Sequence, residues 1–285
     1  MRIAIVVLHY ENLKDTSECL ESLKKYLKDG QNQTDVIVVD NGSVKEKALD
    51  LEKEFQNPKV HFIYSETNQG FARGNNLGFQ YAKHRLHAEI IILANNDLVF
   101  KQADFLERVS REVVKNQIDV AGPKIISIVD KKNQNPVPYC HPDILAVKKR
   151  ILKLEILEFL CTFGLDLFAQ TIFSKEHNVD FKKGTYQLHG ACLIMANNYI
   201  KNYEGLYPDT FMYMEEDILK YITQRDGLNM QYLDDIEVFH KEGSSTEKIY
   251  GAGRKKRLFY YRWNIDSCKK LKHLMESENM NAINK

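Results

Sequence analysis

The stretch EIIILANNDLVF, residues 89–100, carries an apolar run directly into two asparagines and an aspartate. A short continuous apolar run is typical of a strand covered on both faces, as in a parallel sheet. RIAIVVLHY (2–10) and DVIVVDNGS (35–43) have the same character, and each also ends in polar residues. A fourth strand is expected at 59–66, and helices are expected at 15–28, 44–56 and 75–85. This alternation predicts an α/β fold with a mostly parallel sheet and right-handed crossovers.

The polar ends of three predicted strands should meet on one rim of this sheet, where open parallel sheets bind their ligands. They are His9 with Tyr10, Asp40 to Ser43, and Asn95 to Asp97. One carboxylate flanked by amides suits Mg²⁺ or Mn²⁺, which take few protein ligands and complete their shell with substrate phosphates and water. The alternative is a plain turn, because Asn and Asp cap turns readily.

A glycine-rich stretch, NQGFARGNNLG (68–78), precedes a helical pattern and contains Arg73. Glycines let the backbone approach a ligand closely, and an arginine near a helix start suits phosphate. The stretch lacks the dinucleotide fingerprint and follows the third strand instead of the first, which disfavours a dinucleotide oxidoreductase. Asp40 is expected either to accept hydrogen bonds from a base or ribose, or to serve only as a turn residue.

Two further motifs point to chemistry. YMEED (213–217) places three carboxylates at a predicted helix start, where the dipole stabilises a charged general base or where the acids simply cap the helix. His240, in VFHKEGSS, lies where a predicted strand meets a polar loop. It is expected to be either a ligand or an ordinary surface or core histidine.

Composition limits the classes of protein. The 285 residues carry a net charge of +1, so no global field favours nucleic acid as a partner. Five scattered cysteines predict free thiols in a reducing compartment. Without a signal-peptide pattern or an apolar run of spanning length, we expect a cytoplasmic protein.

The second half contains more helix. Residues 143–173 mix Ile, Leu and Phe with charges, which predicts one or two amphipathic helices that pack on the core, form a homodimer or lie on a membrane. GRKKRLFYYRWN (253–264) begins a basic-aromatic helix, and its cluster Arg254 to Arg257 is expected to contact an anionic membrane, to contact acceptor phosphate, or to form a solvated face.

Together, in this order, these motifs resemble the family 2 glycosyltransferases of the GT-A fold, especially the bacterial rhamnosyltransferase-like branch that builds surface polysaccharides. The resemblance spans residues 5 to about 246. It rests on the segments VVLHYEN, CLESL, VIVVDNGS, NQGFARGNNLG, ILANNDLVF, GPKI, HGACLIM, FMYMEEDIL and VFHKEGSS.

The resemblance implies roles for the residues of the donor site. Tyr10 and Asp40 should contact the nucleoside, while Arg73 and Asn76 should lie along the ribose and pyrophosphate. The remaining implied residues come from the strand end and the later histidine loop. Asn95 and Asn96 should also bind the nucleotide sugar, and Asp97 and His240 should bind the divalent metal, Mg²⁺ or Mn²⁺. Asp97 matches the last aspartate of the D-x-D motif, whose first position is Asn95 here.

The family's E-D pair, whose aspartate deprotonates the acceptor, fits EED in two registers. Matching residue identity places the base at Asp217, which we prefer. Counting from Phe211 and Tyr213 places it at Glu216, the rival candidate.

The resemblance thus implies an inverting transferase. It would move a sugar from a donor of the dTDP-rhamnose or UDP-hexose type to a glycan acceptor. The acceptor is either free or linked to a lipid, and in the second case the enzyme would work on the inner face of a membrane. Residues 1–246 would form the GT-A domain, with a nucleotide-sugar half (1–128) and an acceptor and catalytic half (129–246), and 247–285 a helical extension. The alternatives are a sugar nucleotidyltransferase and a non-catalytic nucleotide-sugar-binding module.

Overall fold

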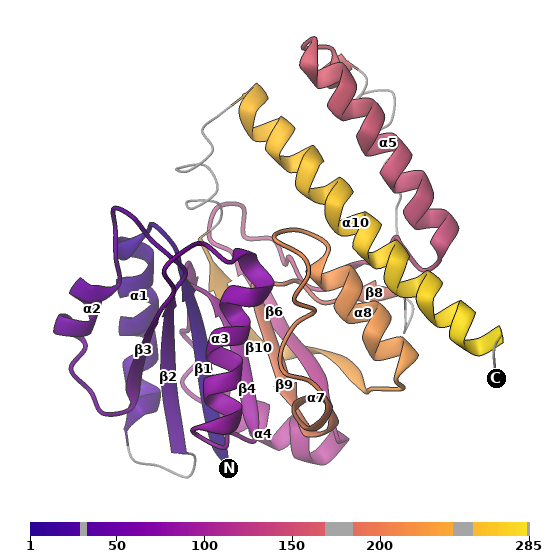
Figure 1. The fold of residues 1–285 in the computed structure, drawn as a ribbon. Helices are drawn as coiled ribbons and strands as arrows, with labels where there is room; N and C mark the ends of the chain where they lie inside the picture. The colour runs from indigo at the N-terminus through magenta and orange to yellow at the C-terminus, as the bar shows by residue number, and fades with distance from the viewer. Residues whose placement is uncertain (29–32, 169–184, 242–252, 284–285) are drawn as a thin grey trace.

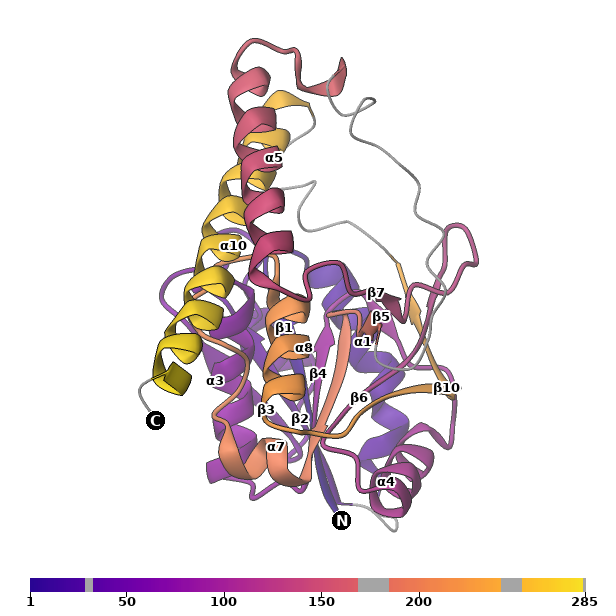
Figure 2. The same ribbon diagram turned by 90° about the vertical axis from the view of Figure 1, so that its right-hand side faces the viewer.

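The computed structural model describes residues 1–28, 33–168, 185–241 and 253–283, with side chains described up to residue 277. One eight-stranded sheet forms the centre, in the order β3-β2-β1-β4-β9-β6-β10-β5, with helices on both faces (Figures 1 and 2). A separate two-stranded sheet pairs β7 with β8. The strands of the main sheet are β1 Arg2–His9, β2 Gln33–Asp40, β3 Val60–Tyr64, β4 Ile90–Asn95, β5 Leu98–Val99, β6 Val120–Ser127, β9 Cys192–Ala196 and β10 Met230–His240. Those of the small sheet are β7 Val137–Pro138 and β8 Tyr186–Gln187.

The first four long strands are parallel, as the sequence predicts. β1 pairs with β2 on one side and with β4 on the other, and β2 pairs with β3. β9 then lies antiparallel to both β4 and β6, and β10 runs parallel to β6 but antiparallel to β5. The prediction of a mostly parallel, helix-flanked sheet is therefore confirmed.

Helices cover the sheet, and several differ from the predicted ranges. The structure has α1 Leu13–Leu23 with the 3₁₀ helix η1 Lys24–Leu27, α2 Leu49–Glu54, α3 Gly70–His84, α4 Phe105–Asn116, α5 Ile144–Thr162, α7 Asn197–Asn202, α8 Glu215–Arg225 and α10 Arg254–Ile283. The charged segment 44–56 is helical only over α2. α4 and α7 are not among the predicted elements, and residues 169–173 and 242–246 of two predicted segments lie outside the described residues.

Helix α3 begins five residues before the predicted start, inside the glycine-rich stretch. Gly70 has φ +82°, and a Cβ there would lie 2.2 Å from the carbonyl oxygen of Phe211. The amide of Phe71 also donates to that carbonyl, at 2.8 Å. The glycine therefore serves close contact between the start of α3 and the segment before α8, since no L side chain fits there.

Apolar residues fill both faces of the sheet. One core lies between the sheet and α1, α2 and α4, and the other lies between the sheet and α3. A third cluster joins α5, α8 and α10 beside the sheet. In Figures 1 and 2, α5 and α10 run side by side and extend beyond the sheet at one end.

Candidate active site

Three strand ends meet on one rim, as the sequence predicts. In the register of the parallel strands, His9 on β1 lies beside Asp40 on β2, and Leu8 lies beside Asn95 on β4. Asp97 follows directly and is buried. The carboxyl ends of β1, β2 and β4 therefore form a common edge, where α/β sheets bind ligands.

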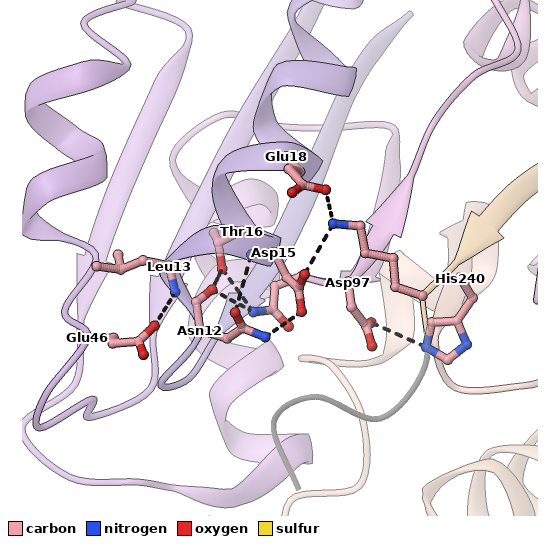
Figure 3. Close-up of polar contacts among 10 residues, drawn as sticks. Asn12, Leu13, Asp15, Thr16, Glu18, Glu46, Asp97 and His240 are labelled. Atoms are coloured by element: carbon pink, nitrogen blue, oxygen red, sulfur yellow. Dashed lines mark hydrogen bonds and ion pairs between the residues drawn. The ribbon is translucent and has the colours of Figure 1, made fainter. Parts of the chain in front are cut away.

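Asp97 and His240 face each other at this edge. His240 ends β10, and its Nε2 lies 3.2 Å from Oδ1 of Asp97 (Figure 3). Its Nδ1 lies 2.7 Å from Oε1 of Gln134, an acceptor, so Nδ1 carries the proton. A proton on Nε2 would donate to this carboxylate, whereas a cation held by both groups would use the lone pair of Nε2.

The donor set fits a divalent cation. Oδ1 of Asp97 is buried and has no hydrogen-bond partner, which is costly unless something else pairs with it. A histidine whose second nitrogen donates to an amide oxygen has the usual arrangement of a metal ligand. Within the described ranges, no group of three His, Cys, Asp or Glu side chains is placed to hold a metal. Asp97 and His240 would therefore supply only part of a coordination shell, as Mg²⁺ and Mn²⁺ sites on phosphate substrates do.

Lys241 ties the end of β10 to α1. Its amide donates to the carbonyl of Asp97 at 3.1 Å. Its ammonium lies 3.1 Å from Asp15 and also pairs with Glu18. Figure 3 shows Asp15 and Glu18 beside the Asp97–His240 pair. These contacts fix the chain immediately after His240 and so orient the imidazole.

Asn96 points away from the rim, toward the start of α1. Its amide donates to Thr16 Oγ1 at 2.9 Å, and Asn12 caps the helix by accepting from the amide of Asp15. His9 joins this buried network through Nδ1 to Thr16 at 2.7 Å, and burial lowers the pKa of its imidazole. The network holds β1, β4 and α1 in register, so Asn96 contributes to the site by fixing the backbone that presents Asp97.

Asp40 has both carboxylate oxygens engaged by its own loop. Oδ1 accepts from the amide of Ser43 at 2.9 Å and Oδ2 from the amide of Ala48 at 2.8 Å. Asp40 thus has the turn role, one of the two alternatives that the sequence allows. Each of its carboxylate oxygens keeps one lone pair with which it could accept from a ligand. Tyr10, next to it on the rim, is half-buried.

Arg73 and Asn76 face the segment 205–209, not Asp97. The amide group of Asn76 donates to the carbonyl of Leu206 and accepts from its amide, both at 2.7 Å. Arg73 is exposed and donates to the carbonyl of Pro208 at 2.7 Å. Both residues line a groove of about 470 Å³ between β3 and α3.

The acidic cluster opens α8, and its three carboxylates have different surroundings. Glu216 accepts a hydrogen bond at 3.1 Å from the amide of Gly190, just before β9 begins. Burial raises the pKa of Glu216, and the neighbouring Asp217 raises it further. Asp217 is held by His141 Nδ1 at 2.5 Å and by Gln187 at 3.3 Å. Glu216 therefore lies against the strand that pairs with β4, whereas both oxygens of Asp217 are engaged.

Glu215 is the first of the three carboxylates and lies in a buried position. Its Oε1 has no hydrogen-bond partner, and burial together with Glu216 raises its pKa from 4.5 to about 8. Between these values the folded protein holds a proton that the unfolded chain releases. Stability from this group is therefore present below pH 4.5 and is lost as the pH rises toward 8.

Glu215→Gln should remove this loss. At pH 8 the variant should have a free energy of unfolding higher than wild type by on the order of 2 kcal/mol, and the gain should shrink toward pH 5. Urea unfolding at several pH values measures it. Glu54→Gln, an exposed change on α2, is the control and should show no pH-dependent gain. A gain for Glu215→Gln that is independent of pH would contradict the assignment.

Several contacts at the site were not predicted from the sequence. They come from Gln134, His141, Gln187, Gly190 and Lys241. Gly190 belongs to HGACLIM, a segment that already carried the family resemblance. Lys241 likewise belongs to VFHKEGSS, and Gln187 lies on β8. Gln134 and His141 lie in polar loops, where a single sequence has no period that would mark them.

Solved structures show the fold. The structure of S. aureus TarS 1–349 in complex with UDP-GlcNAc matches with a TM-score of 0.55 over 88% of this chain and 64% of that chain, at 16% identity. GalNAc-T7 with UDP, GalNAc and Mn²⁺ matches with a TM-score of 0.58 over 85% of this chain and 44% of that one, at 13% identity. At these identities the likeness establishes the GT-A fold, and the predicted fold class is confirmed.

The sequence places the chain more narrowly. Residues 4–194 match the model of glycosyl transferase family 2, and the chain belongs to this family. The expected enzyme class, a glycosyltransferase, is thereby confirmed.

Two relatives carry more specific names. The low-salt glycan biosynthesis hexosyltransferase Agl10 of Haloferax volcanii is 22% identical over 84% of this chain and 67% of its own length. The dTDP-rhamnosyl transferase RfbF of Shigella flexneri is 27% identical over 61% of this chain and 53% of its own length. The chain thus spans about half to two thirds of these relatives.

Proposed function

We propose that this protein is an inverting glycosyltransferase that takes a hexose or deoxyhexose from a UDP- or dTDP-linked donor. The observation that carries the proposal is the buried Asp97 oxygen without a hydrogen-bond partner, 3.2 Å from His240 at the rim of a GT-A sheet. The names of the similar proteins support this donor class, since they include a hexosyltransferase, a dTDP-rhamnosyl transferase and a complex with UDP-GlcNAc.

Asp97 and His240 would hold Mg²⁺ or Mn²⁺, and the Mn²⁺ in the structure of GalNAc-T7 supports this choice. Such an ion, when bound, supplies positive charge to the departing diphosphate. The protein's own part is to orient the two ligands, through Gln134 on the imidazole and Lys241 on the chain that follows it.

We favour Glu216 over Asp217 as the general base. A base must be accessible to the acceptor hydroxyl and should have a pKa near the working pH. Burial raises the pKa of Glu216, and its contact with Gly190 sets it at the β9 side of the rim. Asp217, preferred from residue identity, has both oxygens engaged by His141 and Gln187, which suits a group that positions the start of α8.

The nucleoside and diphosphate would lie along the rim. Tyr10 and Asn95 are half-buried side chains that can contact the donor directly. Asp40 and Asn96 would act mainly by holding the loops under it, because their polar atoms already bind the backbone or α1. Arg73 and Asn76 would shape the segment 205–209, whose Pro208 lines the groove between β3 and α3.

The acceptor in this proposal is a glycan, in the synthesis of a surface polysaccharide. The relative named for low-salt glycan biosynthesis supports a glycan acceptor. We infer a single displacement. In this reaction one carboxylate takes the proton of the acceptor hydroxyl, and no second carboxylate has to attack the sugar as a nucleophile, as it does in retaining enzymes.

Thermal unfolding with nucleotide ligands tests the proposal. UDP- or dTDP-sugars should raise the melting temperature by several degrees in the presence of Mn²⁺ or Mg²⁺. UMP and dTMP, which lack the diphosphate, are the controls and should raise it less. Incubation with UTP or dTTP and a sugar 1-phosphate tests the nucleotidyltransferase alternative. Release of pyrophosphate in that reaction, or no response to any nucleotide diphosphate sugar, would overturn the proposal.

A further inference from the structure

Helix α5 buries one face and leaves the opposite face apolar. Its buried face consists of Val147, Ile151, Leu154, Leu157 and Cys161, which pack in one cluster with residues of α8 and α10. The pair of α5 and α10 extends beyond the sheet (Figures 1 and 2), so much of its length has solvent on the outer side. An amphipathic helix packed on one partner would normally be polar on that outer side.

The outer side is instead apolar. Four large side chains of α5 recur there at helical spacing, and the residues that follow α5 add four more. We call these eight residues the outer stripe: Leu145, Leu152, Ile156, Phe159, Phe163, Leu165, Leu167 and Phe168. Phe159 and Phe163 are 64% and 66% exposed, and Phe168 is 74% exposed. Contiguous exposed apolar surface of this kind marks an interaction site.

The two helices α5 and α10 are strongly positive as a pair. Residues 144–168 and 254–277 together contain twelve Lys and Arg against five Asp and Glu, a net charge of +7 in a chain whose total is +1. Lys148 and Lys149 are exposed next to stripe positions on α5, and Lys148 lies 3.7 Å from Glu276 of α10. Two of the acids, Glu155 and Glu158, are paired with Lys269 and Arg262 of α10, at 2.8 and 2.9 Å.

The cluster Arg254 to Arg257 is not a uniform basic surface. Arg257 pairs with the buried Asp166 at 2.6 Å, and Tyr261 donates to the same carboxylate. Arg254 donates to the carbonyl of Thr162. These two arginines hold the end of α5 against α10, and a contact of the cluster with lipid or acceptor phosphate stays a prediction. Arg254 and Lys255 are the exposed members of the cluster, and Lys256 and Arg257 are half-buried.

We propose that the outer stripe docks on an anionic lipid bilayer, with its phenylalanines among the headgroups and the surrounding lysines on the lipid phosphates. Aromatic and aliphatic side chains on a helix flanked by cations suit such an interface. A second copy of the chain fits less well, because self-pairing of two stripes would bring Lys148 and Lys149 of both copies together. Among the described helices, none combines the length and hydropathy of a membrane span.

Vesicle flotation of the full chain tests the proposal. Wild type should float with vesicles of phosphatidylcholine and phosphatidylglycerol, and about tenfold less with phosphatidylcholine alone. The triple variant Leu152→Gln, Phe159→Gln, Phe163→Gln should lose at least about tenfold of this binding. Val114→Gln with Val129→Gln, both exposed elsewhere, is the matched control and should float like wild type.

The outcomes separate this proposal from the catalytic one. The triple variant should keep its melting temperature and its response to nucleotide sugars, since none of the three residues touches the rim. Lack of flotation by wild type, equal binding to both kinds of vesicle, or equal binding by the triple variant would overturn the proposal. The proposal would also be overturned if wild type fails to float and forms a dimer in light scattering that the triple variant does not form.

Discussion

Asp97→Asn is expected to lower sugar transfer by about 10³-fold, which corresponds to several kcal/mol of lost charge stabilisation in the transition state. The substitution keeps the size of the side chain and the carbonyl contact of residue 97 with Lys241. It removes the negative charge that faces His240 and replaces one of the two carboxylate oxygens with an amide nitrogen, which cannot bind a cation. The fold should therefore persist while metal-assisted donor binding is lost.

Calorimetric titration of UDP- and dTDP-sugars with and without Mn²⁺ measures the effect on binding, alongside turnover. Asp35→Asn is the matched control. Asp35 is a buried carboxylate at the other end of β2, paired with Arg2 at 3.2 Å and His61 at 2.9 Å. Its replacement should lower the free energy of unfolding but leave the metal dependence unchanged. Wild-type turnover in excess chelator, or an unchanged metal response in Asp97→Asn, would contradict the role given to Asp97.

The strands and their rim were predictable from the sequence because burial on both faces leaves a continuous apolar run. β1, β2 and β4 each show this pattern, and it predicts their neighbouring carboxyl ends. Helix α4 was also readable, since Phe105, Val109 and Val113 have helical spacing and are buried, yet it was not predicted. The early start of α3 was not readable in this way, because Gly70 is explained by its contact with Phe211, which lies far along the chain.

Side-chain roles at the site were less predictable, because they depend on long-range partners. Asn76 binds the backbone of Leu206, 130 positions away, and Asn96 binds Thr16, 80 positions away. Both amides occupy motif positions that suggest a ligand, but in the structure they satisfy buried polar groups of the protein. A motif thus predicts where a site lies better than it predicts which of its residues contact the substrate.

Glu216→Gln is expected to lower kcat by about 10²- to 10⁴-fold, the range of general-base catalysis, with little change in donor affinity. Glutamine keeps the acceptor oxygen for the amide of Gly190, so the contact that positions the side chain should survive. Only the ability to take a proton is removed. Turnover and donor titration, measured on the same preparation, separate this loss from a loss of binding.

The pH profile provides an independent readout of the same role. Burial and the neighbouring Asp217 raise the pKa of Glu216 above its ordinary value. The base must be ionised, so wild-type kcat should fall as the pH drops through this raised pKa. The residual activity of Glu216→Gln should lack that acid limb. An acid limb that remains unchanged in the variant would assign it to another group.

Asp217→Asn is the decisive comparison, because this carboxylate is the alternative base and differs in its partners. Asparagine can still accept from one donor, but its amide nitrogen cannot accept from His141 or Gln187, so the start of α8 should loosen. If Asp217 positions the helix, the variant should lose thermal stability and only part of its kcat, and it should keep the acid limb. If Asp217→Asn is instead inactive with an intact fold, while Glu216→Gln stays active, then residue identity and not the count from Phe211 gives the correct register.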